Sequence, residues 1–430
     1  MADVTAIVLN WARPDNVKTI VAHLCNDLLR DTISSVIVWN NSPTQLEPAD
    51  FGISDGRLKI INSEENLFFQ ARFLACLEAE GEWCLVQDDD YLVSIESIKA
   101  LRKYASLYHT QHPIHLLPPH EHLSTTLRTL THSPSHIASF AWLGHGALLT
   151  KSHARAFLDV LRNESGGQEH IMQMADNFFS ILLNRAADVW VDRGLHLGGE
   201  EVAFTVGAEG DARNWYYIAI AEKYLEEIVS RGEPNGFTVL GDKAEEEPVV
   251  RSPCRGGLWS TNVLMLPPNV FEAGRMALDL RSADISRRSA LGEEDAKRYI
   301  QHSLACVGDG SDTVFRSPAG CQEGQWLSFD FLENVTVAGL EIEWIIEPDF
   351  ASEVWAMSYQ VLEGGETWVN ALVQDCTQVD CPGSVKLLTR LDLGSPRTFN
   401  AVRAVIGPGS VLGERPAWGV AGCIVGAKTE

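Results

Sequence analysis

The first half of the chain alternates short apolar runs with runs whose apolar residues recur about every 3.6 positions. The short runs are "TAIVLNW", "ISSVIVWNN", "LKIIN" and "WCLVQ". Between them, Pro14 opens one helical pattern, and residues 67–79 form another. Strands separated by helices of this length pair in parallel, in a sheet that helices cover on both faces. We therefore expect residues 1–235 to form an α/β domain around a mixed sheet.

Polar residues follow three of these four strands directly. Asn10 to Arg13 come after the first strand, Asn40 and Asn41 after the second, and Asp88 to Asp90 after the fourth. In open α/β sheets, ligands bind beyond the carboxyl ends of the strands. The pattern therefore predicts a binding site built from these residues at one edge of the sheet.

The three adjacent aspartates have no lysine or arginine within four residues on either side. In an extended segment, Asp88 and Asp90 point the same way while Asp89 faces elsewhere. Two converging carboxylates suit a hard divalent cation such as Mn²⁺ or Mg²⁺, which accepts water and phosphate oxygens in its remaining positions. The alternatives are a solvated acidic turn, or a cap on the helix that begins near Ser94.

The charge of the chain excludes some partners. There are 58 acidic against 34 basic residues, a formal charge of −24, and no run of basic residues. Nucleic acid is therefore not expected as a partner. No apolar segment approaches the roughly 20 residues of a membrane span, and the strand pattern that begins at Val4 argues against a signal peptide.

The nine cysteines fall into two groups. Cys25, Cys76 and Cys84 lie in apolar patterns and are interpreted as small core residues. Six more follow residue 250, an even number that suits disulfides in an oxidising compartment. We expect either a cytoplasmic protein with free thiols, which is favoured, or a lumenal protein of the secretory pathway whose anchor lies outside this sequence.

The composition and the residue pattern change in the second half of the sequence. A chain of 430 residues also suits two or three domains. Residues 236–255 are rich in glycine, proline and acids, which is typical of a linker. Residues 293–301 form one helical candidate. The runs that follow are short and alternating, which predicts an antiparallel β-sandwich over residues 256–430: "QWLSFDF", "VTVAGLEIEW", "EVWAMSYQVL", "VKLLTRLDL" and "NAVRAVI".

Several ordered motifs over roughly residues 4–230 resemble one enzyme family. "VTAIVLNWARPDNVKTIV", "SSVIVWNNSP", "ENLFFQARF" and "WCLVQDDDYLV" are similar to segments of the exostosin-like retaining glycosyltransferases. "FAWLGHGALL" and "QMADNFFSILL" resemble two later segments, although Met174 and Ala175 replace the usual cysteine–glutamate pair. The resemblance implies a Rossmann-like GT-A fold. It also implies sugar transfer from a nucleotide diphosphate sugar, such as a UDP-sugar, to the hydroxyl of a glycan or small molecule.

The same resemblance implies roles for individual residues. Asp90 would ligate the metal directly, Asp88 would contact the metal or donor sugar, Asp89 would support them, and His196 is a weaker metal candidate. Asp176 and Arg213 would be catalytic, and Gly144 and His145 would face the acceptor. The residues expected to bind the nucleotide are Asn10, Arg13, Asn40, Asn41, Asn66 and Arg72.

Simpler interpretations compete with these roles. Arg72 could be a helix-face arginine bonded to Glu64 or Glu65, and Asp176 could cap the helix that follows it. Arg13 could be a surface arginine, and Asn40 and Asn41 could form a plain turn. No second carboxylate is placed as a covalent nucleophile. The family therefore implies a same-face displacement with retained anomeric configuration.

The second half resembles another family. "CVGDGSDTVFRSPAGCQEGQWLSFDFLENVTVAGLEIEW" is similar to the discoidin domains (coagulation factor 5/8 C-type), although Phe315 stands where tryptophan is frequent. Such domains are jelly-roll sandwiches whose loops at one end bind glycans, lipids or proteins. The resemblance also implies a disulfide between Cys254 and Cys423. The alternative is a structural module that packs on the first domain.

Three functions remain open. The leading hypothesis is a metal-dependent retaining hexosyl- or N-acetylhexosaminyltransferase. The second is a catalytically inactive glycan-binding or adaptor protein that kept both folds. The third, a nucleotidyltransferase, is disfavoured because the first loop lacks the glycines and basic residues that bind triphosphates.

Overall fold

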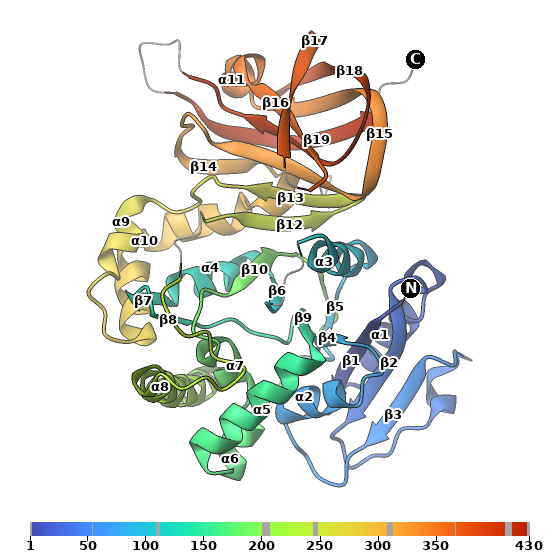
Figure 1. Ribbon diagram of the computed structural model, residues 1–430, viewed down its shortest axis with the longest axis vertical. Helices are drawn as coiled ribbons and strands as arrows, with labels where there is room; N and C mark the ends of the chain where they lie inside the picture. Colours follow the sequence, from blue (N-terminus) through green and yellow to red (C-terminus); the bar gives the residue numbers. More distant parts are fainter. Residues whose placement is uncertain are drawn as a thin grey trace.

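The computed structural model describes residues 2–53, 55–108, 112–199, 207–243, 248–307, 313–365, 367–408 and 415–427. Figure 1 shows a sheet with helices on both sides, followed by a region made mainly of strands. None of the helices within these ranges is both long and apolar enough to cross a lipid bilayer.

The first half begins with β1 (Val4–Asn10), α1 (Pro14–Leu24), β2 (Ile33–Asn40), β3 (Leu58–Asn62), α2 (Gln70–Leu77), β4 (Trp83–Gln87), β5 (Tyr91–Leu92) and α3 (Ile95–Leu107). It continues with β6 (Ile114–Leu117), α4 (Pro119–Leu127), β7 (Thr129–Ser133), β8 (His136–Ser139), β9 (Ala147–Thr150), α5 (Lys151–Ser165), α6 (Glu169–Gln173), α7 (Asp176–Leu182), β10 (Asp188–Val191), β11 (Leu195–His196) and α8 (Gly207–Arg231). Short 3₁₀ turns cover Asp27–Leu29 and Pro48–Phe51.

The strands of the first half form a mixed sheet in the order β10-β6-β9-β4-β1-β2-β3. β1 is parallel to β2 and β4, and β2 is parallel to β3. β9 runs antiparallel between β4 and β6, and β10 is parallel to β6. The predicted Rossmann-like mixed sheet is therefore confirmed.

Alternate residues of each central strand enter two different cores. On β1, Ile7 belongs to a core that includes residues of α2, α5, α7 and α8, whereas Ala6 and Val8 belong to a core that includes residues of α1 and α3. This alternation follows from the two-residue period of a strand. It explains why the strands are apolar along most of their length and why helices cover both faces (Figure 1).

The second half begins with β12 (Val250–Cys254), β13 (Gly257–Thr261), α9 (Pro268–Ala273) and α10 (Leu280–Gln301). The strands and helix that follow are β14 (Phe315–Gly320), β15 (Trp326–Ile346), α11 (Ala351–Ala356), β16 (Ser358–Glu363), β17 (Thr367–Cys381), β18 (Ser384–Val405) and β19 (Ala417–Ala427), with 3₁₀ turns at Leu304–Val307 and Pro348–Phe350. β13 to β19 pair antiparallel throughout, which confirms the predicted strand-rich region.

One local prediction for the second half was wrong and another is confirmed. The run "EVWAMSYQVL" is not one strand, because its first residues complete α11 and only Ser358–Glu363 is extended. The helix predicted over residues 293–301 is confirmed as the part of α10 that follows Gly292. Gly292 has a φ of +74° and separates this part from an earlier helical segment that begins at Leu280 and was not predicted.

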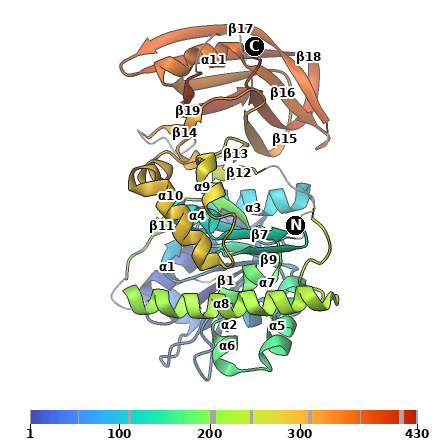
Figure 2. The same cartoon turned by 90° about the vertical axis from the view of Figure 1, so that its left-hand side faces the viewer.

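The sheet does not stop between the two halves. β12 pairs with β10, β13 pairs with β12 and β15, and β15 pairs with β18. Figure 2 shows β12 and β13 between the helices of the first half and the strands of the second. β12 lies inside residues 236–255, the predicted linker, so the boundaries 1–235, 236–255 and 256–430 stay a prediction.

The disulfide implied between Cys254 and Cys423 was wrong, and a disulfide between two core cysteines of the first half was not predicted. Cys76 and Cys84 form a disulfide, because α2 packs on the sheet beside β4. Cys254 and Cys423 are free thiols, as are the other cysteines whose side chains the structure describes: Cys25, Cys321, Cys376 and Cys381. Burial raises the pKa of both the Cys254 and Cys423 thiols, which keeps them protonated in the core.

Candidate functional site

Three asparagines form a ladder across the ends of β1, β2 and β3. Nδ2 of Asn10 donates to Oδ1 of Asn40 at 2.7 Å, and Nδ2 of Asn40 donates to Oδ1 of Asn62 at 2.7 Å. Nδ2 of Asn40 also donates to the carbonyl of Thr44 at 2.8 Å. The side-chain amide of Asn40 is therefore engaged within the protein, and its contact with a nucleotide stays a prediction.

Asn41 and Asn66 shape the loop that leads into α2. The side chain of Asn41 donates to the carbonyl of Phe68 and accepts from the amide of Leu67, both at 3.2 Å. Oδ1 of Asn66 accepts from the amide of Phe68 at 2.8 Å, and Phe68 has a φ of +48°. These bonds hold a strained turn just before α2, so both asparagines act on the position of that helix.

Asp88, Asp89 and Asp90 occupy the turn between β4 and β5, which we call the acid turn. Nε2 of Gln87 donates to the carbonyl of Tyr91 at 2.8 Å and closes the turn. The three acids do not cap α3, since Oγ of Ser94 accepts from its first turn instead. The capping alternative is therefore wrong, and these acids need another explanation.

Arg13 pairs with the side of this turn that faces α1. Its Nη1 lies 2.6 Å from Oδ1 of Asp89 and 3.4 Å from Oδ2 of Asp90. Its Nε donates to the carbonyl of Gly199 at 2.9 Å. The Arg13 side chain is largely buried, and both Asp89 and Asp90 contact it, whereas Asp88 pairs with Arg72.

Arg72 joins the acid turn to α7. It is fully buried in α2, and its Nη2 lies 2.8 Å from Oδ1 of Asp88 and 2.9 Å from Oδ2 of Asp176. The alternative pairing with Glu64 or Glu65 is wrong, because those side chains are exposed while Arg72 faces the sheet. One guanidinium nitrogen therefore fixes three segments against each other.

Asp176 is the first residue of α7, yet it does not cap that helix. Burial raises the pKa of Asp176 to about 7, and the charge of Arg72 opposes the shift. Several buried polar atoms beside this pair have no hydrogen-bond partner within the described residues: Nε and Nη1 of Arg72, Oδ1 of Asp176, and both amide atoms of Asn177. Such atoms are rare in folded proteins, so they mark a place where a further polar group fits.

Negative charge exceeds positive charge at this edge of the sheet. Four carboxylates, those of Asp88, Asp89, Asp90 and Asp176, share the guanidinium groups of Arg13 and Arg72. Burial, followed by the charge of Asp88, raises the pKa of Asp90 to about 6. A divalent cation would offset this excess.

The metal ligands expected from the sequence do not gather into one cluster within the described ranges. There, no group of three or more histidine, cysteine, aspartate or glutamate side chains converges to hold an ion. His196 is exposed on β11, and its Nδ1 accepts from the amide of Gly198 at 3.2 Å. Asp88 and Asp90 offer carboxylate oxygens to a metal, and a bound diphosphate would add further oxygen ligands.

Gly144 and His145 contact the acid turn. The carbonyl of Gly144 accepts from the amide of Asp88 at 2.8 Å, and a Cβ at this glycine would overlap the Asp88 carboxylate. The ring of His145 meets Tyr91 edge-on at 4.7 Å between centroids, and burial lowers the pKa of His145 to about 4. Their acceptor role stays a prediction.

Asp192 belongs to the same edge and was not predicted. It directly follows β10, and burial raises its pKa to about 6. Its Oδ1 accepts from the amide of Gly194 at 3.3 Å, while the hydroxyl of Tyr91 donates to the carbonyl of Arg193. These contacts fix the segment that carries His196. The sequence signal was an acid placed directly after a strand, as in the turn after β4.

Arg213 lies on α8, which packs against α7, the helix that begins with Asp176. The ring of Tyr217, one turn further along α8, meets Phe178 at 6.2 Å between centroids. Burial lowers the pKa of Arg213. Its catalytic role stays a prediction.

No family model and no curated protein matches the chain. Solved structures of glycosyltransferases are among those that are similar. A mannosyltransferase from Pyrobaculum calidifontis, in complex with GDP-Man and Mn²⁺, is 14% identical over 54% of this chain and 77% of its own, with a TM-score of 0.31. TarS 1–349 from S. aureus, in complex with UDP-GlcNAc, is 16% identical over 53% of this chain and 71% of its own, with a TM-score of 0.34.

A third solved structure covers a smaller share of the chain. CpGH89CBM32-5 from Clostridium perfringens, in complex with GalNAc-beta-1,3-galactose, is 17% identical over 29% of this chain and 82% of its own, with a TM-score of 0.20. Across the three structures, TM-scores of 0.20 to 0.34 are too low to transfer a ligand or an activity to this chain.

Proposed function

We propose that this protein is a metal-dependent glycosyltransferase that transfers a sugar from a nucleotide diphosphate sugar to an acceptor hydroxyl, with retained anomeric configuration. The supporting observation is the set of four carboxylates and two arginines at the carboxyl edge of the sheet. The excess of acid fits a cation, and ligands of α/β sheets bind at this edge.

Asp90 and Asp88 would hold Mn²⁺ or Mg²⁺. When bound, the ion would neutralise the negative charge that develops on the departing diphosphate. Asp90 is the better ligand, because its side chain is about one-third exposed and its contact with Arg13 is long, at 3.4 Å. Asp88 already shares Arg72, so it would serve the ion with its other oxygen.

The arginines would hold the phosphates and orient the acids. Arg13 keeps Asp89 turned away, which leaves Asp90 as the acid available for the ion. Arg72 has two donors without a partner among the described residues, and these suit a phosphate oxygen or a water bound to it. Arg213 would neutralise the same diphosphate from α8.

Asp176 would act beside the reacting sugar. Its Oδ2 is held by Arg72, while Oδ1 has no partner within the described ranges and can accept from a substrate hydroxyl. An ionised carboxylate there would stabilise positive charge on the sugar ring in the transition state. We propose a same-face displacement, in which the leaving phosphate takes the acceptor proton.

The test is a calorimetric and thermal-shift screen of nucleotide sugars with and without Mn²⁺. UDP-GlcNAc, UDP-glucose and GDP-mannose form the starting panel. We expect one donor to stabilise the protein only when Mn²⁺ is present, because a ligand stabilises the folded state in proportion to its saturation. Asp90→Ala should abolish the shift, whereas Asp159→Ala, which removes an exposed acid of α5, should not.

Product analysis tests the remaining parts of the proposal. An NMR time course should show the retained anomer first, and an inverted first product would overturn the retaining mechanism. Binding of glycans without affinity for any nucleotide would instead support the inactive adaptor.

A further inference from the structure

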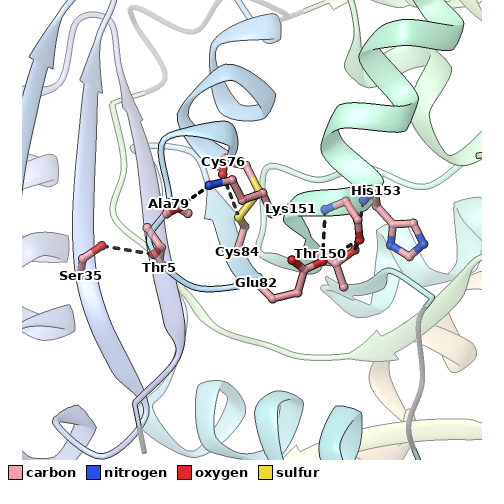
Figure 3. The surroundings of a disulfide bond; sticks show 10 residues. Thr5, Ser35, Cys76, Ala79, Glu82, Cys84, Thr150, Lys151 and His153 are labelled. Carbon is pink, nitrogen blue, oxygen red and sulfur yellow. Dashed lines mark hydrogen bonds between the residues drawn. A yellow bond between two sulfur atoms is a disulfide. The ribbon is translucent and has the colours of Figure 1, made fainter.

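The disulfide joins the two elements that carry opposite charges of the site. Cys76 lies in α2, one turn after Arg72, and Cys84 lies in β4, four residues before Asp88. Figure 3 shows the bond between the helix and the strand. Residues four apart on a helix share a face, so the arginine and the sulfur both look toward the sheet.

Arg72 needs α2 to be held accurately. Its Nη2 is within 3 Å of both Asp88 and Asp176, in a fully buried position. A buried charge is tolerated only while its partners stay in place. If one partner is lost, the charge is left with neither an ion-pair partner nor water to solvate it. A small slide of α2 along β4 would therefore break the arrangement on which the site depends.

α2 is held by its tertiary contacts, such as those of Phe73 with Phe157 of α5 and Phe179 of α7, and not by its own ends. It has only eight residues, and no side chain caps its first turn. A helix of this length is marginal without tertiary anchors. A strained turn at Phe68 leads into α2, so the start of α2 is not held by a preceding helix or strand.

The connection between helix and strand is already fastened elsewhere. Nζ of Lys151 donates to the carbonyl of Ala79 at 2.6 Å, and Oγ of Ser152 donates to Oε1 of Glu82 at 2.6 Å. The amide of Lys151 donates to the carbonyl of Glu82 at 2.7 Å. Because Lys151 holds this turn (Figure 3), the disulfide is not required to order it. Its distinct effect falls on the face of α2 that also carries Arg72.

We infer that Cys76 and Cys84 are positioning residues, whose disulfide holds Arg72 on Asp88 and Asp176. Both cysteines are fully buried, so a dithiol in solution does not reach the bond in the folded protein. The bond is therefore a structural disulfide and not a redox switch. Its effect on donor binding rests on the proposed function, but its effect on Arg72 and the acid turn does not.

The test uses the full chain with Cys76→Ala and Cys84→Ala together. Hydrogen exchange, read well below the unfolding temperature, should become faster in peptides that cover residues 66–72 and 88–92. Affinity for UDP with Mn²⁺ should fall about tenfold, as expected when a binding group is misplaced by a fraction of an ångström to an ångström. Cys321→Ala, which removes a buried free thiol of the second half, should change neither.

A second variant, Cys76→Val with Cys84→Ala, refills part of the lost volume and replaces the first if that variant does not fold. Unchanged exchange at residues 88–92 in a folded variant would overturn the inference, whether or not the wild type binds a nucleotide. A wild-type protein that binds no nucleotide would contradict the proposed function alone. Faster exchange with weaker binding, and full folding, would support both.

Discussion

Nδ1 of His122 lies 2.6 Å from Oη of Tyr299, and this contact joins α4 of the first half to α10 of the second. Both side chains are buried. Burial lowers the pKa of His122 to about 4, so the ring is neutral at pH 7. The two halves of the molecule thus share a neutral hydrogen bond inside their common core.

Tyr299→Phe should destabilise the protein by about 1–3 kcal/mol, because it leaves a buried ring nitrogen of His122 without a partner. Urea unfolding at pH 7 measures the change. Tyr216→Phe, which removes a hydroxyl from a 58% exposed tyrosine, is the matched control and should have little effect. Equal midpoints for the two variants would show that the contact does not stabilise the fold.

A fragment of residues 1–235 should unfold at a lower temperature than the full chain and should self-associate. Leu123 and Leu127 of α4 pack in the core of the second half, and Leu258 of β13 packs in that of the first. Truncation would expose this apolar surface and the β10 edge. Calorimetry and size-exclusion chromatography of both proteins measure the effect. A monomeric fragment with an unchanged midpoint would favour two independent domains.

The edge of the sheet could be predicted from sequence because strand ends are local features. Asp88, Asp89 and Asp90 directly follow an apolar strand, and parallel strands bring their carboxyl ends together however the helices pack. The alternating direction of side chains in a strand does not extend into the turn, where Asp89 and Asp90 both contact Arg13 while Asp88 contacts Arg72. The prediction of the edge itself needs only the period of a strand and the order of the elements.

The ion-pair partners of Arg72 could not be predicted from local sequence patterns. Its partners, Asp88 and Asp176, are far from it in the chain, whereas the nearest acids, Glu64 and Glu65, do not pair with it. The pairing depends on how α2 and α7 pack on the sheet, and no short pattern encodes that. The Cys76–Cys84 disulfide was missed for the same reason, since each cysteine also suits an apolar core.

In the second half, local propensity was misleading. Val354 and Trp355 favour strands, yet they lie in α11, where Val354 is buried and Trp355 is half exposed.

α10 begins where Oδ1 of Asp279 accepts from the amide of Ser282 at 2.7 Å. That cap was visible in the sequence, but the polar residues after it hide the period of the helix.

Glu222→Gln should flatten the pH dependence of stability. Burial raises the pKa of Glu222 to about 7, above its ordinary value of 4.5. The stabilisation from its proton is therefore complete below pH 4.5 and is lost as the pH rises through about 7. Urea unfolding near both pH values should show the wild type losing stability relative to the variant at the higher pH.

Glu233→Gln is the matched control for this measurement, since Glu233 is exposed just beyond the end of α8. It should leave the pH dependence of the wild type unchanged. If Glu222→Gln and Glu233→Gln shift the unfolding free energy by the same amount at both pH values, the carboxyl group of Glu222 is not protonated in the folded protein.

Gly144→Ala should weaken donor binding without unfolding the protein. A Cβ at this position would overlap Oδ2 of Asp88 and lie 2.9 Å from its Cγ. The backbone cannot retreat easily, because the carbonyl of Gly144 accepts from the amide of Asp88. The Asp88 carboxylate must therefore shift, which disturbs its pairing with Arg72. Calorimetric titration of UDP with Mn²⁺ should show affinity about tenfold to a hundredfold lower. Gly56→Ala, where the added methyl meets open space, should bind like the wild type. Equal affinities for all three proteins would mean that Asp88 does not contribute to the donor site.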